Sequence, residues 1–207
     1  VGGGVRYAGA QKELFDLATQ INAPVTTTLM GVGCFPEDHP LSLGMLGMHG
    51  TKYANYAIQE SDLILAVGAR FDDRVTGKIS SFAPHAKVVH IDVDPAEVGK
   101  NVRVDIPVVG DAKNALSALV KEVGPKPRSE WNEKVEGWKK DYPLRYIPDM
   151  NIIKPQYVIE KICEIAPEAI ITTEVGQNQM WAAQFFVHKD PSKFISSGGL
   201  GTMGYGL

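Results

Sequence analysis

The sequence predicts an α/β protein in which helices flank a parallel sheet, followed by a truncated second α/β unit. Strand-like and helix-like segments alternate through residues 1–123, which is typical of a parallel sheet with right-handed crossovers. Two of the strand-like runs, residues 62–67 and 87–93, are largely apolar, as strands buried on both faces are. The alternation resumes near Pro155, after a break that contains prolines.

Apolar spacing, β-branched runs and capping residues define the elements of the first unit. Residues 8–21 form a helix in this prediction, because Leu14, Ala18 and Ile21 recur on one helical face. Asp111 is a good N-cap for a second helix that continues through residue 120. The expected strands are residues 1–4 (the tail of a first strand), 24–28, 62–67, 87–93 and 102–109.

A linker with a helix separates the two units. Ser129 is a suitable helix cap, and Trp131, Val135 and Trp138 share one face of the helix that follows, so we expect them to pack on a neighbouring domain. Pro155 suits the first turn of the next helix. The second unit is expected to contain a helix at 155–165, a strand at 169–173, a helix at 177–188 and a strand at 193–196. The predicted domains are residues 1–123, 124–150 and 151–207.

Composition excludes several classes of protein. The net charge is −3 and no Lys/Arg-rich run occurs, so nucleic acid is not an expected partner. No apolar run reaches the roughly 18 residues of a membrane helix. Cys34 and Cys163 lie far apart, outside any metal-ligand spacing, which favours a reducing compartment such as the cytoplasm. An organelle-targeting peptide in a longer parent protein is compatible with this expectation.

Both ends of the chain favour a piece of a larger enzyme. The first residue is valine, and the triple glycine that follows it is expected to end a strand. The last ten residues, 198–207, contain a glycine-rich stretch in which the backbone can approach an anionic ligand closely. We therefore expect a ligand loop at each end.

Glycine, aspartate and arginine follow most of the predicted strands, where an open parallel sheet binds its ligands. This pattern suits a nucleotide with a diphosphate. The triple glycine is either a phosphate loop or a tight turn, because Tyr7 occupies the place of the third glycine in the usual dinucleotide fingerprint. Thr28 ends the strand at which an acidic residue would usually hold a ribose. The ribose ligand is then Asp92 or Asp94; the alternative is that these residues only cap the loop beside Pro95.

Two further loops have both a functional and a structural interpretation. Arg70 and Arg74 either neutralise an anionic ligand or pair with Asp72 and Asp73 in a surface cluster. The loop at 43–50, rich in glycine and methionine, either supports a planar ring such as a flavin or fills core space. We find no metal-ligand spacing, no Walker loop and no Gly-x-Ser-x-Gly turn.

Seven phrases occur in a distinctive order: TLMG (28–31), LGMLGMHG (43–50), VGARFDDRVTGK (67–78), HIDVDP (90–95), IPVVGD (106–111), EVGQNQMW (174–181) and SGGLGTMG (197–204). Together they resemble the acetohydroxyacid synthase (acetolactate synthase) catalytic large-subunit family along the whole chain. The resemblance implies that residues 1–123 are a Rossmann-like FAD-binding middle domain. It also implies that residues 151–207 begin a thiamine-diphosphate-binding domain.

The resemblance implies a reaction as well. Pyruvate is decarboxylated on thiamine diphosphate and condensed with pyruvate or 2-oxobutyrate, the first step of branched-chain amino-acid synthesis, while FAD has no net redox part. The activating glutamate and the Mg²⁺ ligands of the family are expected outside residues 1–207, so the chain alone is expected to be inactive. The family also implies a homo-dimer or homo-tetramer and a possible regulatory small subunit. The alternatives are a pyruvate oxidase or glyoxylate carboligase type of enzyme, or a non-catalytic flavin-nucleotide-binding module.

The resemblance implies a specific role for individual residues within these motifs. The residues implied to contact FAD are Gly2, Gly3, Gly4, Thr28, Leu29, Met30, Leu46, Gly47, Met48, His49, Gly68, Arg70, Asp92, Val93, Gly110 and Asp111. The residues implied to lie near thiamine diphosphate are Gln177, Asn178, Gly199, Leu200 and Met203. Asp73 and Arg74 are implied to lie near the substrate channel.

Overall fold

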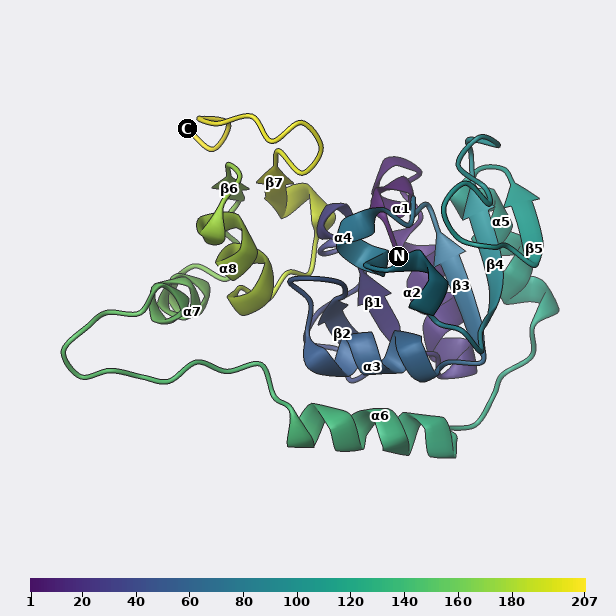
Figure 1. Ribbon diagram of the computed structural model, residues 1–207, viewed down its shortest axis with the longest axis horizontal. Coiled ribbons are helices and arrows are strands. Elements are labelled where there is room, and N and C mark those ends of the chain that lie inside the picture. Colours follow the sequence, from purple (N-terminus) through teal and green to yellow (C-terminus); the bar gives the residue numbers. More distant parts are fainter.

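The computed structural model describes residues 1–207 as two α/β units (Figure 1). The first unit contains α1 (Gly3–Tyr7), α2 (Gln11–Ile21), β1 (Val25–Thr27), η1 (Leu29–Gly31), β2 (Ser42–Met45), α3 (Lys52–Glu60), β3 (Leu63–Val67), α4 (Asp73–Thr76), η2 (Ile79–Ser81), β4 (Lys87–Asp92), β5 (Ile106–Val109) and α5 (Ala112–Glu122). Then come α6 (Glu130–Asp141) and a second unit of α7 (Pro155–Ile165), β6 (Ile171–Thr173), α8 (Gln177–Phe185), η3 (Pro191–Lys193) and β7 (Phe194–Ser196). None of the helices has the length and apolar character needed to cross a lipid bilayer.

All strand pairs are parallel, which confirms the predicted sheet type. They form three small sheets, with the orders β1-β2, β3-β4-β5 and β6-β7. Successive side chains of the three-stranded sheet point to opposite faces. Val67 and Ile91 join the core formed with α2 and α5, whereas Ile64, Ala66 and Val88 join a second core on the other face.

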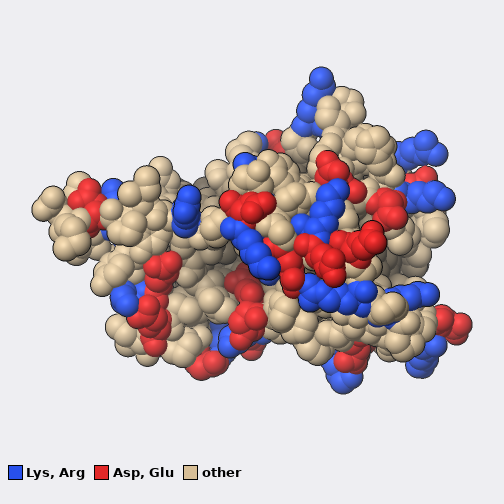
Figure 2. All heavy atoms as spheres, turned by 90° about the horizontal axis from the view of Figure 1, so that it is seen from below, with Lys and Arg blue, Asp and Glu red and all other residues tan.

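The helix α6 lies along the first unit beneath α3 in Figure 1, as its apolar spacing predicts. The predicted cap is present, because the backbone N–H of Ser129 donates to the side chain of Asn132 (3.0 Å) in a capping box. Val135 is buried, and Trp131 and Trp138 pack beside it on residues of α3 and β2. Figure 2 shows Lys, Arg, Asp and Glu side chains intermingled on the face that carries α6.

The structure differs from the sequence-based elements in several places. Residues 3–7 form a helix rather than the tail of a strand, because the chain turns where it meets Gly68, and only Val1 and Gly2 keep strand-like hydrogen bonds. The strand β2 and the helix α3 were not predicted, although Thr51 caps α3 by accepting a hydrogen bond from the N–H of Ala54 (3.1 Å). The strand expected at 102–109 begins only at 106, and the helix expected at 177–188 ends at 185.

Three glycines allow the segment at the N-terminus to lie directly on the end of β3. A Cβ atom on Gly2 would lie 2.1 Å from the carbonyl oxygen of Gly68, and one on Gly4 would lie 2.5 Å from the Cα of Gly68. Gly68 itself has a φ of +56°, which glycine adopts without strain. The contact therefore requires glycine on both sides, and it fixes the loop that follows β3.

Contacts between the two units fix their relative position. The guanidinium of Arg6 donates to the carbonyl oxygen of Phe194 (3.1 Å), and the side-chain amide of Gln184 donates to the carbonyl oxygen of His49 (2.7 Å). A Cβ atom on Gly33 would lie 2.7 Å from the carbonyl carbon of Asp190, so the two backbones touch there as well. The units therefore meet along a polar and close-packed boundary.

A buried acid lies on this boundary. The carboxyl of Glu37 accepts a hydrogen bond from the backbone N–H of His188 (2.8 Å), and the N–H of Glu37 donates to the carbonyl oxygen of His188 (3.1 Å). Burial raises the pKa of Glu37 to about 8, and burial lowers the pKa of His188 to about 4. Both side chains are therefore uncharged near neutral pH.

The glycine contact predicts a steric cost for Gly4→Ala. Alanine favours helix by about 1 kcal/mol over glycine, so without the contact this change in α1 would stabilise the protein. We expect instead a loss of about 2 kcal/mol in the free energy of unfolding, measured by urea denaturation, because the new methyl group overlaps Gly68. Gly110→Ala is the matched control, since nothing lies within 4 Å of its Cβ position. Equal effects of the two substitutions would contradict the steric account.

The buried acid predicts a pH dependence of stability. The folded protein keeps the proton on Glu37 up to about pH 8, whereas the unfolded chain loses it near pH 4.5, so this group's contribution to stability falls as the pH rises between these values. Glu37→Gln removes the ionisation, and we expect the variant to match the parent chain at or below pH 4.5 and to exceed it by about 5 kcal/mol above pH 8, because each unit of pKa difference corresponds to about 1.4 kcal/mol. His188 contributes to stability in the opposite sense, because its buried ring stays neutral in the folded protein. Its contribution to the free energy of unfolding is lost as the pH falls from 6.5 to about 4.

Glu122→Gln is the control, because Glu122 is exposed at the end of α5. Urea denaturation over this pH range gives the comparison. A Glu37→Gln variant that follows the parent chain at every pH would show that Glu37 is ionised in the folded protein.

Candidate functional site

A cleft of about 1350 Å³ lies where the carboxyl ends of β1, β3 and β4 meet the loops of the second unit. This volume exceeds the roughly 300–1,000 Å³ of most ligand pockets, so the cleft has room for an elongated ligand. The sequence-predicted residues that line it are Gly3, Gly4, Thr28, Leu29, Met30, Leu46, His49, Gly68, Arg70, Arg74, Asp92, Gln177, Gly199 and Leu200. Segments far apart in the chain thus contribute to one cavity.

The other predicted residues do not line the cleft: Gly2, Gly47, Met48, Asp73, Val93, Gly110, Asp111, Asn178 and Met203. Several of them hold the wall in shape. Gly47 has a φ of +91°, and a Cβ atom there would lie 2.2 Å from the carbonyl oxygen of Arg74. Asp111 caps α5 by accepting the N–H of Asn114 (3.0 Å), as predicted. The side chains of Met48, Val93 and Met203 are exposed.

The arginines of the loop after β3 are available to an anion. Arg70 lies 3.9 Å from Asp72, and Arg74 lies 3.0 Å from Asp73, with all four side chains largely exposed. Exposed pairs of this kind contribute about 1 kcal/mol or less, so they compete weakly with a bound phosphate. Asp72 has a structural task as well, because its carboxylate accepts the N–H groups of Arg74 and Val75 and caps α4. The structure therefore contains the ion-pair cluster, and Arg70 and Arg74 also line the cleft.

Asp92 stands at the end of β4 on the cleft wall. Its Oδ1 atom accepts the N–H of Asp94 (3.0 Å), and its Oδ2 atom lies 3.8 Å from Nε2 of His90. His90 is fully buried, neither of its ring nitrogens has a hydrogen-bond partner, and its ring meets the edge of Phe71. Asp94 also lines the cleft, but it is exposed and accepts the N–H of Ala96 (2.9 Å). Asp92 is thus the better-fixed carboxylate of the two.

Soft apolar side chains form another part of the wall. Leu46 and His49 come from the loop after β2, and the sulfur-bearing side chains of Met30 and Met45 lie nearby on the same cleft. Met30 is close to the second unit, because a Cβ atom on Gly198 would lie 2.6 Å from its Sδ atom. Such a wall suits a flat ring, and the arginines and Asp92 suit a phosphate and a ribose, so the residues present fit a flavin nucleotide.

The glycine-rich loop after β7 supplies backbone donors. The Oγ atom of Ser197 accepts the N–H of Thr202 (2.8 Å), and the carboxylate of Glu174 accepts the N–H of Gly204 (2.5 Å), so the loop is folded back on β6. The amides of Gly199, Leu200 and Met203 make no hydrogen bond within the protein. Free amides on a glycine-rich loop fit a diphosphate.

Buried polar side chains form a hydrogen-bond network at Ser196, where β7 ends and this loop begins. Ser196 accepts hydrogen bonds from the hydroxyl of Thr173 (2.8 Å) and from the side-chain amide of Gln179 (2.5 Å). The three residues come from β7, β6 and α8, so the network joins all three elements. No group of three or more His, Cys, Asp or Glu side chains is placed to hold a metal.

Several residues on the cleft wall were not assigned a ligand contact from the sequence: Tyr7, Glu97, Gln179, Trp181, Gln184 and Tyr205. Gln179, Trp181 and Gln184 lie along α8. The sequence predicted where this helix starts, but it did not predict which face of the helix lines the cleft. Tyr7 lies one turn beyond the triple glycine and is largely exposed. The residue types around these six positions do not indicate which of the side chains face the cleft.

Comparisons with known proteins agree with this arrangement. Residues 1–119 match the family described as thiamine pyrophosphate enzyme, central domain. Residues 174–207 match the family described as thiamine pyrophosphate enzyme, C-terminal TPP binding domain. The predicted order of the two units is thus confirmed.

Curated relatives match the whole chain. It is 55% identical to a probable acetolactate synthase large subunit of Methanocaldococcus jannaschii, of which it covers 36%. It is 52% identical to the acetolactate synthase large subunit of Parasynechococcus marenigrum, of which it covers 34%. It is 51% identical to the chloroplastic acetolactate synthase 1 of Zea mays, of which it covers 33%.

The chain thus spans about a third of the length of the curated relatives it matches. These relatives do not favour an oxidase, a carboligase of another type or a non-catalytic flavin module. The two family matches and the relatives lead to one conclusion: the chain belongs to the thiamine pyrophosphate enzyme family, and within it resembles acetolactate synthase large subunits over its whole length.

Proposed function

We propose that this chain forms the flavin-binding and diphosphate-binding region of an acetolactate synthase large subunit. In the proposed reaction, pyruvate is decarboxylated and its two-carbon unit is joined to pyruvate or 2-oxobutyrate, which begins branched-chain amino-acid synthesis. The observation that carries the proposal is the identity of 49% to 55% with acetolactate synthases across the entire chain. The single cleft formed by loops of both units supports it.

Each part of the chain has a proposed task. Residues 1–123 form the FAD-binding middle domain, residues 124–150 connect the domains, and residues 151–207 begin the domain that binds thiamine diphosphate. Thiamine diphosphate, when bound, supplies the electron sink for the decarboxylation. The protein residues bind and orient the cofactors and exclude water from the cleft.

Side chains of the first unit have roles that follow from their chemistry. Asp92 accepts hydrogen bonds from ribose hydroxyls, and Arg70 and Arg74 neutralise phosphate or substrate charge. The residues Leu46 and His49 contact the flat flavin ring. The substrate channel passes Asp73 and Arg74 at the exposed edge of the cleft.

Residues of the second unit bind the diphosphate end of the thiamine cofactor. The free amides of Gly199, Leu200 and Met203 donate to its phosphate oxygens, and the loop shape that exposes them is held by Glu174 and Ser197. Gln177 and Asn178, at the start of α8, complete this end of the site. The Mg²⁺ ion that accompanies the diphosphate takes its ligands from residues outside this chain.

Partners and location are also proposals. The substrates are 2-oxoacids, and the protein works as a homo-dimer or homo-tetramer, with a regulatory small subunit as a possible partner. Cys34 and Cys163 are both free thiols, which supports a reducing compartment such as the cytoplasm.

A chimera tests the proposed function. The 207 residues replace the matching segment of the Zea mays acetolactate synthase 1, to which they are 51% identical. We expect the purified chimera to form acetolactate from pyruvate when thiamine diphosphate, Mg²⁺ and FAD are present. The 207-residue chain alone, assayed beside it, is expected to form none. A folded chimera that binds FAD but makes no acetolactate would contradict the proposal.

A second prediction separates Asp92 from Asp94 in the same chimera. Asp92→Asn removes the charge of the proposed ribose ligand, and we expect FAD affinity to fall by about 10-fold, as for the loss of a hydrogen bond to a charged group. Asp94→Asn is the matched control and is expected to leave the affinity within about 2-fold. Titration of FAD by flavin fluorescence measures both. A larger effect of Asp94→Asn would transfer the ribose contact to that residue.

A further inference from the structure

The loop between β3 and α4 is fixed at both of its ends. At its start, the carbonyl of Gly68 accepts a hydrogen bond from the N–H of Gly4 (3.1 Å). Where α4 begins, the carbonyl of Arg74 accepts a hydrogen bond from the N–H of Met48 (2.8 Å). Between these contacts lies Arg70, whose exposed side chain lines the cleft. The position of Arg70 therefore depends on what holds the middle of the loop.

The backbone of Phe71, in the middle of this loop, is strained. Its φ is +53°, in the left-handed region that a bulky side chain rarely adopts. Such a conformation persists only where the surrounding contacts impose it. The buried ring of Phe71 supplies one restraint, because it packs edge-on against the rings of His90 and Phe82, with centroids 5.1 Å and 6.0 Å away.

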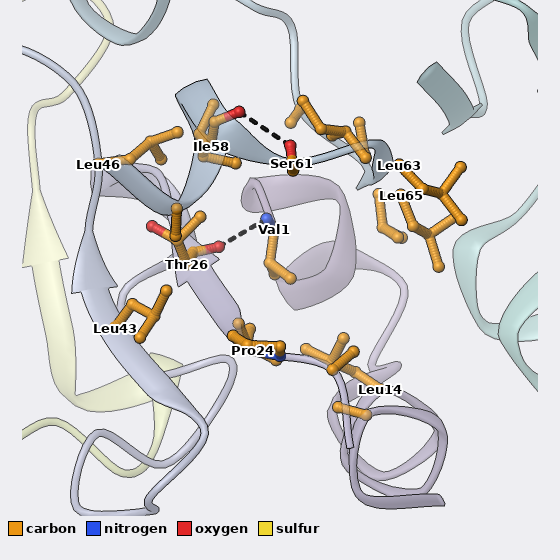
Figure 3. Close-up of a pocket in the computed structure, with 18 of the residues that line it drawn as sticks. Val1, Leu14, Pro24, Thr26, Leu43, Leu46, Ile58, Ser61, Leu63 and Leu65 are labelled. Atoms are coloured by element: carbon orange, nitrogen blue, oxygen red, sulfur yellow. Dashed lines mark hydrogen bonds between the residues drawn. The ribbon is translucent and has the colours of Figure 1, made fainter. Parts of the chain in front are cut away.

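The apolar surroundings of Phe71 differ from those of the arginines on the same loop. Phe71 belongs to the second core of the first unit, and it borders an apolar cavity of about 330 Å³. Leu43 and Leu65 lie on the walls of this cavity (Figure 3). Arg70 and Arg74 line the cleft and do not line the cavity. The ring of Phe71 thus anchors the loop in apolar surroundings, while the arginines stay at the cleft.

Asn101 supplies the second restraint on the loop. It lies in the segment between β4 and β5, and its Nδ2 atom donates to the carbonyls of Arg70 (3.2 Å) and Phe71 (3.1 Å). No other hydrogen bond within the protein involves the backbone of residues 69–71. The next residue, Val102, is buried in the same core as Phe71, so the segment that carries Asn101 is itself fixed.

We propose that Asn101 is a positioning residue for Arg70, an inference that rests on the proposed function because the anion at Arg70 is that of FAD. Asn101 does not line the cleft, so it acts through the loop and not on the ligand. By holding two successive carbonyls, it keeps Phe71 in its strained conformation and fixes the backbone of Arg70. Without these hydrogen bonds the strain relaxes, and the guanidinium loses its place at the cleft.

Titration of the chimera with FAD tests the inference on two matched asparagine variants. Asn101→Ala removes both hydrogen bonds to the loop, and we expect FAD to bind about 5- to 10-fold more weakly. Asn132→Ala is the control, because Asn132 also donates its side-chain amide to a backbone carbonyl, that of Asn22 (2.7 Å), and neither residue lines the cleft. We expect this control to leave FAD affinity within about 2-fold. Equal FAD affinities of the two variants would overturn the inference.

A double-mutant cycle separates positioning from a general loosening of the protein. Arg70→Gln removes the proposed anion contact, and we expect it to weaken FAD binding by about 10-fold in the parent chimera. In the Asn101→Ala background, we expect the same change to weaken binding by about 2-fold or less, because Arg70 has already lost its position. Additive effects would overturn the inference. So would an Arg70→Gln variant that binds FAD as tightly as the parent, since Arg70 would then have no contact to position.

Hydrogen exchange without FAD tests the loop itself. The carboxylate of Asp72 accepts the N–H groups of Arg74 and Val75, each at 3.2 Å. We expect these two amides to exchange at least about 5-fold faster in Asn101→Ala than in Asn132→Ala. Equal exchange would overturn the inference. A parent chimera that does not bind FAD would contradict the proposed function instead, and the exchange rates would still decide whether Asn101 holds the loop.

Discussion

The architecture of the first unit depends on one backbone contact, between the N-terminal segment and the end of β3. Gly2 and Gly4 approach Gly68 so closely that no side chain fits between them, and Val1 and Gly2 bond to β1 and β3 together. This contact joins two separate sheets and sets the direction of α1. It also fixes the start of the loop that carries Arg70 and Arg74, so the shape of the cleft follows from it.

The cleft arises because both units direct the carboxyl ends of parallel strands toward each other. The first unit contributes charged groups and soft apolar side chains, and the second contributes free backbone amides. The units are held by groups that are themselves buried at their boundary, such as Glu37 and His188. The boundary contacts that position the two units therefore also position the two halves of the cleft.

Much of the fold and site is predictable from the sequence, because it depends on local patterns. The buried runs of β3 and β4, the caps at Asp111 and Ser129 and the loops after strands follow from residue type and spacing. The helix α1, the strand β2 and the orientation of α8 do not, since they depend on contacts with distant residues. The triple glycine illustrates the limit: composition suggested a ligand loop or a tight turn, and only the position of Gly68 explains Gly2 and Gly4.

The central claim is that loops of both units form one cleft, in which the first unit binds FAD and the second unit binds the diphosphate of thiamine diphosphate. Hydrogen exchange of the chimera with each cofactor added alone, followed by mass spectrometry, tests it most directly. We expect FAD to slow exchange in residues 68–74 after β3, and thiamine diphosphate with Mg²⁺ to slow exchange in residues 197–203 after β7. Unchanged exchange of either segment with its own cofactor bound would contradict the claim.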